Sequence, residues 1–168
     1  VFGIHFISGF EANSNLPESE KNSITRLANQ LKIPVSIVDC RKEFSTNVVN
    51  YFSSSYLSGR TPNPCMICNS IIKFGILLKI AIDHGATCLA TGHYARIHKE
   101  SSGRITIMKG LDPQKDQSYF LARLTQKQLQ MACFPLGSMT KIEVRILAAE
   151  KGLTPIKKDE SQDICFIH

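Results

Sequence analysis

Short apolar runs alternate with segments of helical periodicity through the first half of the chain. Continuous apolar runs bounded by turn residues predict buried strands, and apolar positions three to four residues apart predict amphipathic helices. These patterns predict strands at 1–6, 34–40 and 86–93 and helices at 19–33, 46–59 and about 70–84. Strands separated by helices in this order predict a parallel sheet with crossover helices, and therefore an α/β fold.

Capping residues mark the ends of two of these helices. Asn69 is the predicted N-cap of the helix at 70–84, and Gly85 is its predicted C′ residue. Gly59 is the stop signal for the helix at 46–59. The first of these predictions places Cys68 at a helix N-terminus.

The second half of the chain predicts a hairpin followed by helices. The segments 94–99 and 104–110 read as two strands joined by "ESSG". Helical periodicity then returns, and it predicts helices at 116–124, 125–132 and 140–152. In the last of them, Thr140 and Glu143 have the spacing of a capping box and Gly152 is the stop signal.

Length and composition are those of a globular protein. The 168 residues fit one domain with a small appendage, and 43% apolar residues suffice for a core. We see no apolar run long enough to span a membrane and no signal peptide, so we expect a cytoplasmic protein without a membrane partner. Since the chain opens on Val1 in a strand-like run, we expect it to be a fragment trimmed at its N-terminus.

Positive charge is concentrated in the second half of the chain. Residues 96–158 hold 12 Lys and Arg against 5 Asp and Glu, while the remainder holds 8 against 9. A basic segment suits a polyanion such as nucleic acid, because neutralisation of phosphates dominates that kind of binding. A soluble protein with a high isoelectric point is the alternative interpretation.

The six cysteines predict reduced thiols rather than a disulfide framework, because the chain has no secretory signal and is large enough to fold without covalent links. Cys40, Cys88 and Cys133 occur in or beside strand-like apolar runs. Free cysteine behaves as a small hydrophobic residue, so we predict that these three are ordinary buried thiols.

Cys65 and Cys68 form a C-x-x-C pair with several possible roles. A helix N-terminus at Cys68 would favour its thiolate, as a nucleophile or metal ligand requires. A zinc site needs two further ligands, and His84 would lie roughly 20 Å away along a helix. A thioredoxin-like motif would follow a strand directly, whereas this pair follows a loop. Cys165 is the remaining candidate for a third thiol, and a purely structural pair stays open.

Two other segments carry candidate chemistry. In "ATGHYAR" (90–96), Gly92 lets a ligand approach the backbone past a strand, and His93 is placed for a phosphate or a base. The alternative is a turn with a surface histidine. In "QKDQSYFL" (114–121), three polar residues cluster at a predicted helix start: Lys115, Asp116 and Gln117. The alternative is a capping segment with solvated charges.

Taken in order, five segments resemble the catalytic domain of bacterial tRNA 2-thiouridylases of the MnmA type. They are "GRTPNPCMICNSIIKF", "LATGHYARI", "GLDPQKDQSYFLARLTQKQL", "FPLGSMTKIEVRILAAEKGL" and "KKDESQDICFI". The resemblance implies a PP-loop ATPase fold of the adenine-nucleotide α-hydrolase-like (HUP, Rossmann-like) class. It further implies a nucleotide-binding part at 1–98 and, at 99–168, a hairpin with a helical tRNA-contacting part that returns to the active site at Cys165.

The resemblance also implies a reaction. ATP, with Mg²⁺, adenylates the 2-oxygen of the wobble uridine of certain tRNAs, and a persulfide then attacks C2 so that AMP leaves. Cys165 carries the persulfide, which a sulfur-relay protein or cysteine desulfurase supplies. Cys68 is the other catalytic cysteine and releases the sulfur by forming a disulfide with Cys165.

Further site residues are implied position by position. Phe6 and Gly92 match positions against ATP, Phe6 mainly through its backbone. The positions implied to contact the tRNA or to flank its extruded base are Asn63, Pro64, Cys65, His93, Lys115, Asp116 and Gln117.

This sequence departs from the family pattern in two places. The family's Ser-Gly-Gly-x-Asp-Ser phosphate loop is absent and would lie upstream of Val1, so we expect this chain alone to bind ATP poorly and to be inactive. Cys65 stands where many members have Asp. The thiols of Cys65, Cys68 and Cys165 could hold a 4Fe–4S cluster, because thiolates suit such a cluster.

The remaining alternatives concern the sulfur chemistry and the class of protein. Persulfide–disulfide chemistry without metal is the rival to the cluster, and structural zinc is a third reading of the thiols. A non-catalytic tRNA- or nucleotide-binding remnant and a zinc-stabilised structural module are the rivals to an enzyme.

Overall fold

The computed structural model describes residues 1–10, 18–153 and 164–167. The chain divides into two compact units, Val1–Cys65 with Pro155–His168, and Met66–Thr154. The boundary predicted at residue 98 lies inside a strand of the second unit. Parallel strand pairs and helices confirm the predicted α/β class.

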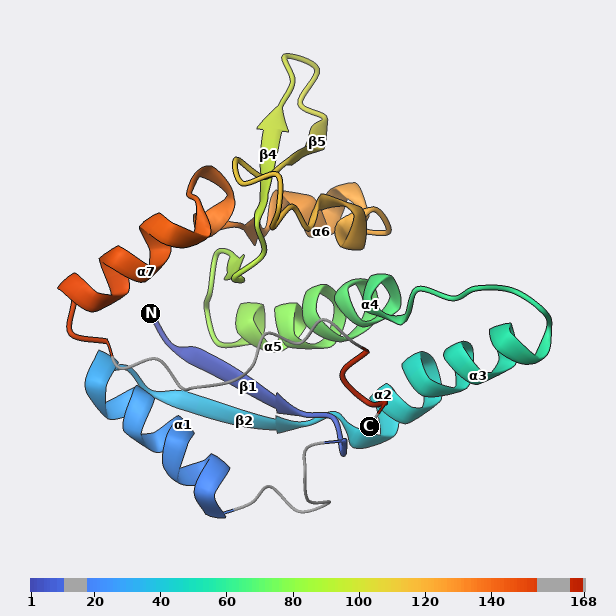
Figure 1. The fold of residues 1–168 in the computed structure, drawn as a ribbon, viewed down its shortest axis with the longest axis horizontal. Helices are drawn as coiled ribbons and strands as arrows, with labels where there is room; N and C mark the ends of the chain where they lie inside the picture. Colours follow the sequence, from blue (N-terminus) through green and yellow to red (C-terminus); the bar gives the residue numbers. More distant parts are fainter. Residues whose placement is uncertain (11–17, 154–163, 168) are drawn as a thin grey trace. The chain divides into compact units, whose positions relative to one another are not determined.

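In the first unit, a crossover helix joins two parallel strands. Strand β1 (Gly3–Ile7) pairs with β2 (Val35–Asp39) from Gly3 opposite Val35 to Ile7 opposite Asp39, and α1 (Glu18–Leu31) connects them (Figure 1). These three elements confirm the predicted strand–helix–strand order.

A second helical segment of this unit begins directly after β2. It consists of α2 (Arg41–Phe44), the π-helical turn η1 (Ser45–Val49) and α3 (Asn50–Leu57). It starts before the predicted residue 46 because Asp39 accepts a hydrogen bond from the Arg41 N–H at 3.1 Å, which satisfies a donor of the first turn. It ends as predicted, since Gly59 adopts φ +70° and its N–H donates to the Tyr56 carbonyl.

One long helix carries the C-x-x-C pair, and it begins earlier than predicted. Its consecutive parts are α4 (Pro64–Ile67), the π-helical η2 (Cys68–Leu77) and α5 (Leu78–Asp83). Pro64 suits the first helical position, because its fixed φ is helical and its missing N–H would have no partner there. The prediction that Asn69 is the N-cap is therefore wrong. The predicted end is confirmed, since Gly85 has φ +82° and the Ala86 N–H donates to the Ala81 carbonyl at 2.9 Å.

This helix also corrects the prediction about apolar runs. Its 20 residues, Pro64–Asp83, are long and apolar enough to cross a membrane by length and composition. Core helices of globular proteins pass the same test, and this one buries Ile72, Phe74 and Leu77 while it carries Lys73. We therefore interpret it as a core helix.

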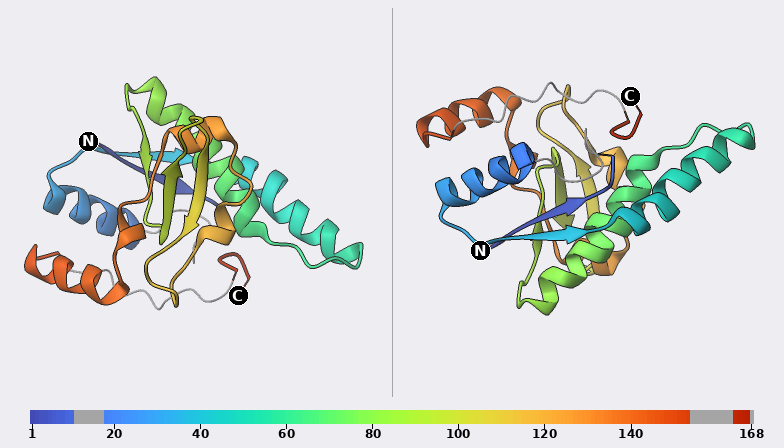
Figure 2. Two further views of the ribbon diagram at one scale, coloured as in Figure 1. Left: turned by 90° about the horizontal axis from the view of Figure 1, so that it is seen from above. Right: turned by 90° about the horizontal axis from the view of Figure 1, so that it is seen from below.

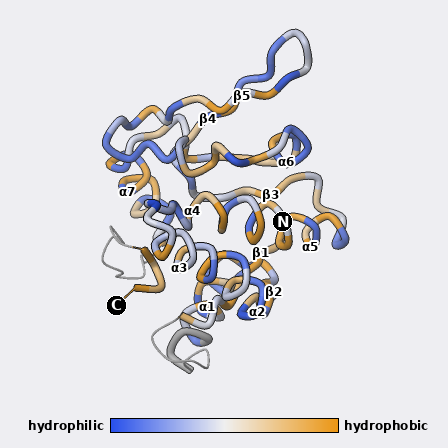
Figure 3. The backbone as a smooth tube through the Cα atoms, turned by 90° about the vertical axis from the view of Figure 1, so that its right-hand side faces the viewer, coloured by the Kyte–Doolittle hydropathy of each residue, from blue (hydrophilic) through white to orange (hydrophobic). Residues whose placement is uncertain are grey.

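The second unit contains two separate strand pairs. Strand β3 (Leu89–Ala90) pairs in parallel with β6 (Ala132–Cys133), a strand that the sequence analysis missed. Strands β4 (Ala95–Lys99) and β5 (Ile105–Lys109) form the predicted antiparallel hairpin, seen side by side in Figure 2. The loop that joins them is hydrophilic in Figure 3.

The helices after the hairpin are shorter than predicted, except for the last. They are the 3₁₀ turns η3 (Ser118–Leu121) and η4 (Pro135–Ser138) and the α-helices α6 (Gln126–Gln130) and α7 (Lys141–Glu150). The Thr140–Glu143 capping box of α7 and the stop at Gly152, with φ +64°, are confirmed.

These elements enclose the core of the second unit. Its buried members come from the long helix, the hairpin, η3, α6 and the segment around β6: Phe74, Ala95, Ile105, Leu121, Leu124, Leu129, Ala132 and Phe134. Because Phe74 belongs to the helix that carries Cys68, that helix is fixed to the hairpin and to η3 by apolar packing.

Candidate functional site

The two thiols of the C-x-x-C pair occupy different turns of the long helix. Cys65 is the second residue of the helix, within the turn whose N–H groups lack helical carbonyl partners, and Cys68 opens the π-helical part. Both side chains are half-buried. The prediction that Cys68 lies at the helix N-terminus is wrong by one turn, so the favourable end of the dipole acts more directly on Cys65.

Asn69 ties the helix beside Cys68 to the segment at 118–121. Its side chain is buried, and its Nδ2 donates to the Phe120 carbonyl at 3.0 Å. This contact spans 51 positions of sequence, and its only sequence signal is a polar residue within an apolar helix. It connects two of the segments that the sequence analysis singled out separately.

His93 is buried in the second unit, not exposed on a turn. Its Nδ1 lies 2.8 Å from the Thr91 hydroxyl, and its ring packs against Phe74 and Phe134 with centroid separations of 6.4 and 6.0 Å. Burial, with a smaller effect from the positive charge of Lys73, lowers the pKa of His93 to about 4. The imidazole is therefore neutral at physiological pH, and its predicted contact with tRNA stays a prediction.

Acid should weaken the fold through His93. Its folded pKa of about 4 lies below the ordinary 6.5, so the unfolded chain binds the proton more tightly. We expect the free energy of unfolding to fall as pH drops from about 6.5 to about 4, by on the order of 3 kcal/mol from this residue. Denaturant titrations across that pH range should show this loss in the parent but not in His93→Gln. The exposed His98→Gln is the matched control, and equal pH dependence in all three proteins would contradict the assignment.

The turn at 91–94 is joined to the segment that follows the hairpin. The Gln117 N–H donates to the Tyr94 carbonyl at 2.9 Å, and Gln117 Oε1 accepts from the Tyr94 N–H at 3.1 Å. Gly92 is exposed, and among the residues that the structure describes a Cβ at its position would meet only Leu136 Cδ1, at 3.8 Å. The predicted approach of a ligand to this backbone stays a prediction.

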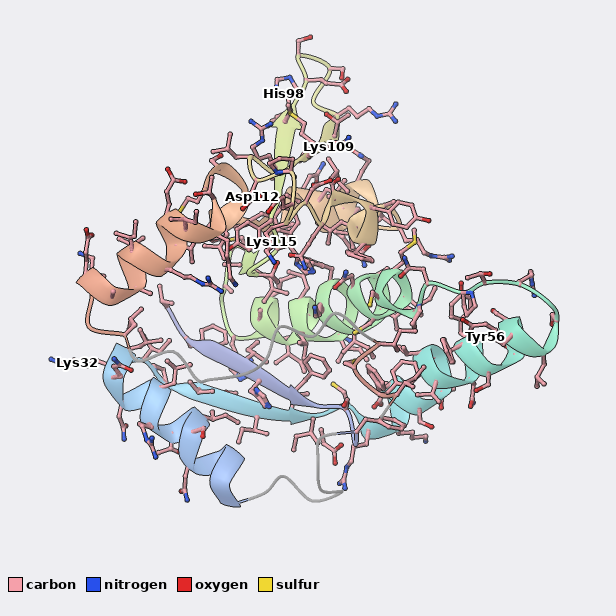
Figure 4. The ribbon with its side chains drawn as sticks, in the orientation of Figure 1. Lys32, Tyr56, His98, Lys109, Asp112 and Lys115 are labelled. Carbon is pink, nitrogen blue, oxygen red and sulfur yellow. The ribbon has the colours of Figure 1, made fainter. Side chains whose placement is uncertain are left out.

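Asp116 organises the loop that carries Lys115. Its carboxylate accepts hydrogen bonds from the N–H groups of Gly110 and Ser118, at 2.9 and 3.2 Å, and from the Ser118 hydroxyl. Burial favours the neutral acid, but these hydrogen bonds outweigh it and hold the pKa of Asp116 below its usual value. Figure 4 places Lys115 and Asp112 in this loop, which follows β5.

In the first unit, an aromatic cluster surrounds the residue after Cys165. The Phe166 ring lies 5.7 Å from that of Phe10, 5.8 Å from that of Phe44 and 5.3 Å from that of Phe52. Cys165 itself is exposed. The sequence analysis missed this role of Phe166, whose only signal is an aromatic residue in a polar segment.

Three further predicted site residues belong to the first unit. Phe6 lies inside β1, opposite Val38, rather than just past the strand. Asn63 immediately precedes the long helix, and Pro64 opens it. Their predicted contacts with ATP and tRNA stay predictions.

The other thiols differ in their exposure. Cys40 is buried as predicted, and burial, followed by the nearby charges of Glu43 and Asp39, raises its pKa to about 11. Cys88 is exposed, so the prediction of a buried thiol is wrong there, because the strand around it is limited to Leu89–Ala90. Cys133 is half-buried in β6.

The candidate metal ligands are divided between the two units. Within either unit, the part of the chain that the structure describes holds no cluster of three His, Cys, Asp or Glu side chains suited to a metal ion. Cys65 and Cys165 belong to the first unit and Cys68 to the second, so the three-thiol set stays a prediction.

The second unit carries the net positive charge of the chain. Residues 66–154 include 12 Lys and Arg against 6 Asp and Glu, which accounts for the formal net charge of +6. The remaining residues hold equal numbers of positively and negatively charged side chains. Cys68, Gly92 and Lys115 therefore share the cationic unit.

Parallel strand pairs, a crossover helix and a thiol-bearing core helix make this an α/β protein. The sequence model of the family described as tRNA methyl transferase HUP domain matches residues 9–168. The chain belongs to this family.

Curated relatives carry a more specific name. The chain is 52% identical over 167 residues to the tRNA-specific 2-thiouridylase MnmA of Desulfosudis oleivorans, covering 99% of this chain and 45% of that protein. It is 56% identical over 142 residues to the protein of the same name from Geotalea uraniireducens, covering 84% of this chain and 38% of that protein. It is 51% identical over 177 residues to the tRNA-specific 2-thiouridylase MnmA of Geobacter metallireducens, covering 99% of this chain and 48% of that protein. The chain spans about half the length of the curated relatives it matches, or less.

Proposed function

We propose that the protein containing this chain is an ATP-dependent tRNA-uridine 2-sulfurtransferase that makes 2-thiouridine at the wobble position. The observation that carries the proposal is the identity of 51–56% to proteins named tRNA-specific 2-thiouridylases, over a region that includes Cys68. The family description names methyl transfer instead. Two thiols in candidate site segments favour sulfur chemistry.

The proposed chemistry divides the work between two cysteines. Cys165, exposed in its unit, carries the sulfane sulfur as a persulfide, and this sulfur attacks C2 of a uridine whose 2-oxygen has been adenylated. The Cys68 thiolate then attacks Cys165 Sγ. The sulfane sulfur stays on C2, AMP leaves, and the Cys68–Cys165 disulfide must be reduced before another cycle.

ATP with Mg²⁺ is the proposed co-substrate, and Gly92 and Phe6 are its proposed contacts. The exposure of Gly92, and the absence of a side chain there, support a close approach of the ligand to this backbone. Phe6 would contribute mainly backbone contacts.

The cationic second unit supports tRNA as the polyanionic substrate. Its net charge of +6 suits phosphate contacts, and Lys115 is the proposed contact near the target base. Asp116 and Gln117 are proposed to shape this loop against the tRNA, with Asn63, Pro64 and His93 beside the extruded base. The setting is proposed to be the cytoplasm, with a sulfur-relay protein or a cysteine desulfurase as donor.

The identity of residue 65 raises a second form of the sulfur chemistry. Cys65, Cys68 and Cys165 would supply three thiolates to a 4Fe–4S cluster, which would carry the transferred sulfur on its fourth iron. Purifying the full-length protein anaerobically and measuring visible absorption, iron and sulfide decides between the two forms. An iron-free, active preparation would exclude the cluster, and bound zinc that persists in Cys165→Ser would favour a structural site.

The function itself is tested by reconstitution. Full-length protein, a tRNA transcript, ATP, Mg²⁺ and a persulfide donor should yield 2-thiouridine at the wobble position, detected by nucleoside mass spectrometry, and also AMP. Omitting ATP should abolish the product. Tight tRNA binding without AMP or 2-thiouridine formation would instead establish a non-catalytic binding protein.

A further inference from the structure

One side-chain amide in α6 makes four hydrogen bonds, two of them to the helix that carries Cys68. Gln128 Oε1 accepts from the Thr125 N–H at 2.9 Å and from the Thr125 hydroxyl at 3.2 Å. Its Nε2 donates to the carbonyls of Ser70 and Phe74 at 2.8 and 2.9 Å. A backbone N–H can only donate and the two carbonyls can only accept, so this orientation of the amide is the one that satisfies every group.

The two acceptor carbonyls lie in the π-helical part of the long helix. The segment η2 runs from Cys68 to Leu77, and π-helical turns are rare, short and frequent at functional sites. A Cβ at Gly75 would lie 3.1 Å from the Ser70 carbonyl oxygen, so the backbone at residue 75 closes tightly on the carbonyl five residues earlier. Gln128 donates to that same carbonyl from outside the helix.

The π-helical bonding decides which way Cys68 points. An i→i+5 turn contains more residues than an i→i+4 turn, so a change between the two rotates everything on one side of the segment relative to the other. Cys68 is the first residue of this segment, and Phe74 within it is anchored in the core. The direction of the Cys68 side chain therefore depends on the bonding that is kept between residues 68 and 77.

Two amides fasten this part of the helix to its surroundings. Asn69, which is 3% exposed, donates to the Phe120 carbonyl, and Gln128 donates to Ser70 and Phe74. The contacts of Gln128 join residues 54 and 58 positions apart. Gln128 is thus tied both to the start of α6, through Thr125, and to the carbonyls that follow Cys68.

We propose that Gln128 is a positioning residue that holds the π-helical bonding of η2 and thereby directs the Cys68 thiol. The inference rests on the proposed function, in which Cys68 reacts with the Cys165 persulfide. In this role Gln128 acts through Cys68, so its effect is expected on the rate of the chemical step and not on tRNA affinity.

The test compares two full-length variants that each weaken the Thr125–Gln128 capping box. Gln128→Met removes all four hydrogen bonds of the side-chain amide at similar side-chain length. Thr125→Ala removes only the two hydrogen bonds of the Thr125 hydroxyl and keeps both donations to η2. We expect Gln128→Met to lower kcat for 2-thiouridine formation by about 10–100-fold with an unchanged KM for tRNA. Thr125→Ala should stay within about 3-fold of the parent in kcat.

A second readout does not depend on tRNA thiolation. The rate of Cys68 alkylation, measured by peptide mass spectrometry, should change in Gln128→Met and not in Thr125→Ala. Equal losses in both variants, or no change in Gln128→Met, would overturn the proposal. If Gln128→Met does not fold, the same two measurements on Gln128→Glu test the proposal. This variant keeps the acceptor oxygen and loses the two donations to η2. Failure of both to fold while Thr125→Ala folds would assign Gln128 to stability alone and would also overturn it.

The proposed function can fail separately from this inference. Full activity in Cys68→Ser would remove the role of Cys68, whatever Gln128 does. Loss of activity in Cys68→Ser together with a fully active Gln128→Met would leave the function standing and reject the positioning role.

Discussion

A Cys68→Ser variant of the full-length protein is expected to lose tRNA thiolation by roughly 10³-fold or more, because a hydroxyl cannot attack Cys165 Sγ as a thiolate does. Cys165→Ser should lose as much, since its side chain would no longer carry the sulfane sulfur. Binding of tRNA should change little in either variant. Nucleoside mass spectrometry measures the product, and a filter-binding titration measures the affinity.

Two further cysteine variants make this experiment specific. Cys88→Ser replaces an exposed thiol outside the candidate site and should keep the parent activity. Cys65→Ser separates the two forms of the chemistry, because it would disrupt a three-thiolate cluster but would leave a persulfide–disulfide pair intact. Thiolation by Cys68→Ser at the parent rate would remove this cysteine from the mechanism.

Gly137→Ala is expected to destabilise the second unit by about 3 kcal/mol or more. A Cβ at this position would overlap the carbonyl group of Ala95, which is fully buried in β4. The backbone around Gly137 has no room to retreat, since its N–H donates to the Phe134 carbonyl at 3.0 Å and its own carbonyl accepts from Leu111 at 2.8 Å. Chemical denaturation followed by circular dichroism gives the free energy of unfolding.

Gly92→Ala is the matched control for stability. Within the described part of the chain, a Cβ there meets Leu136 Cδ1 at 3.8 Å, an ordinary contact, so we expect a change in the free energy of unfolding below about 1 kcal/mol. Equal stabilities of Gly137→Ala and Gly92→Ala would show that η4 and β4 can separate without cost.

Local signals predicted the ends of elements well. Gly59, Gly85 and Gly152 end their helices at positive φ, because an extra turn would force a residue with a Cβ into that conformation. The Thr140–Glu143 pair forms its capping box since both partners lie within one turn. Each of these features depends on residues within a few positions, so the sequence contains the whole cause.

Elements that depend on distant partners were predicted poorly. Asn69 looks like an N-cap locally, but its amide is used by Phe120, and Pro64 starts the helix instead. The periodicity at 116–124 suggests a helix, yet the side chains of Asp116 and Gln117 bond to Gly110 and Tyr94, which leaves one 3₁₀ turn. Strand β6 is two residues long and exists through its pairing with β3.

In the candidate site, too, local features could be predicted from the sequence and long-range contacts could not. The C-x-x-C pair, the turn at Gly92 and the loop at Lys115 stood out as separate segments, and the hydrogen bonds that join their elements could not be read from them. The contacts of Gln128 with Ser70 and Phe74 cross more than 50 residues and involve backbone carbonyls, which have no sequence signature.

The aromatic cluster around Phe166 has a consequence for the sulfur transfer proposed for Cys165. Consecutive Cα atoms are about 3.8 Å apart, so a ring held by Phe10, Phe44 and Phe52 leaves its neighbour Cys165 little more than the reach of its own side chain. A carrier group on a long swinging arm can visit donor and acceptor in turn, and this thiol cannot while Phe166 stays packed. If Cys165 carries the transferred sulfur, as proposed, the donor and the acceptor must therefore each come to this cysteine.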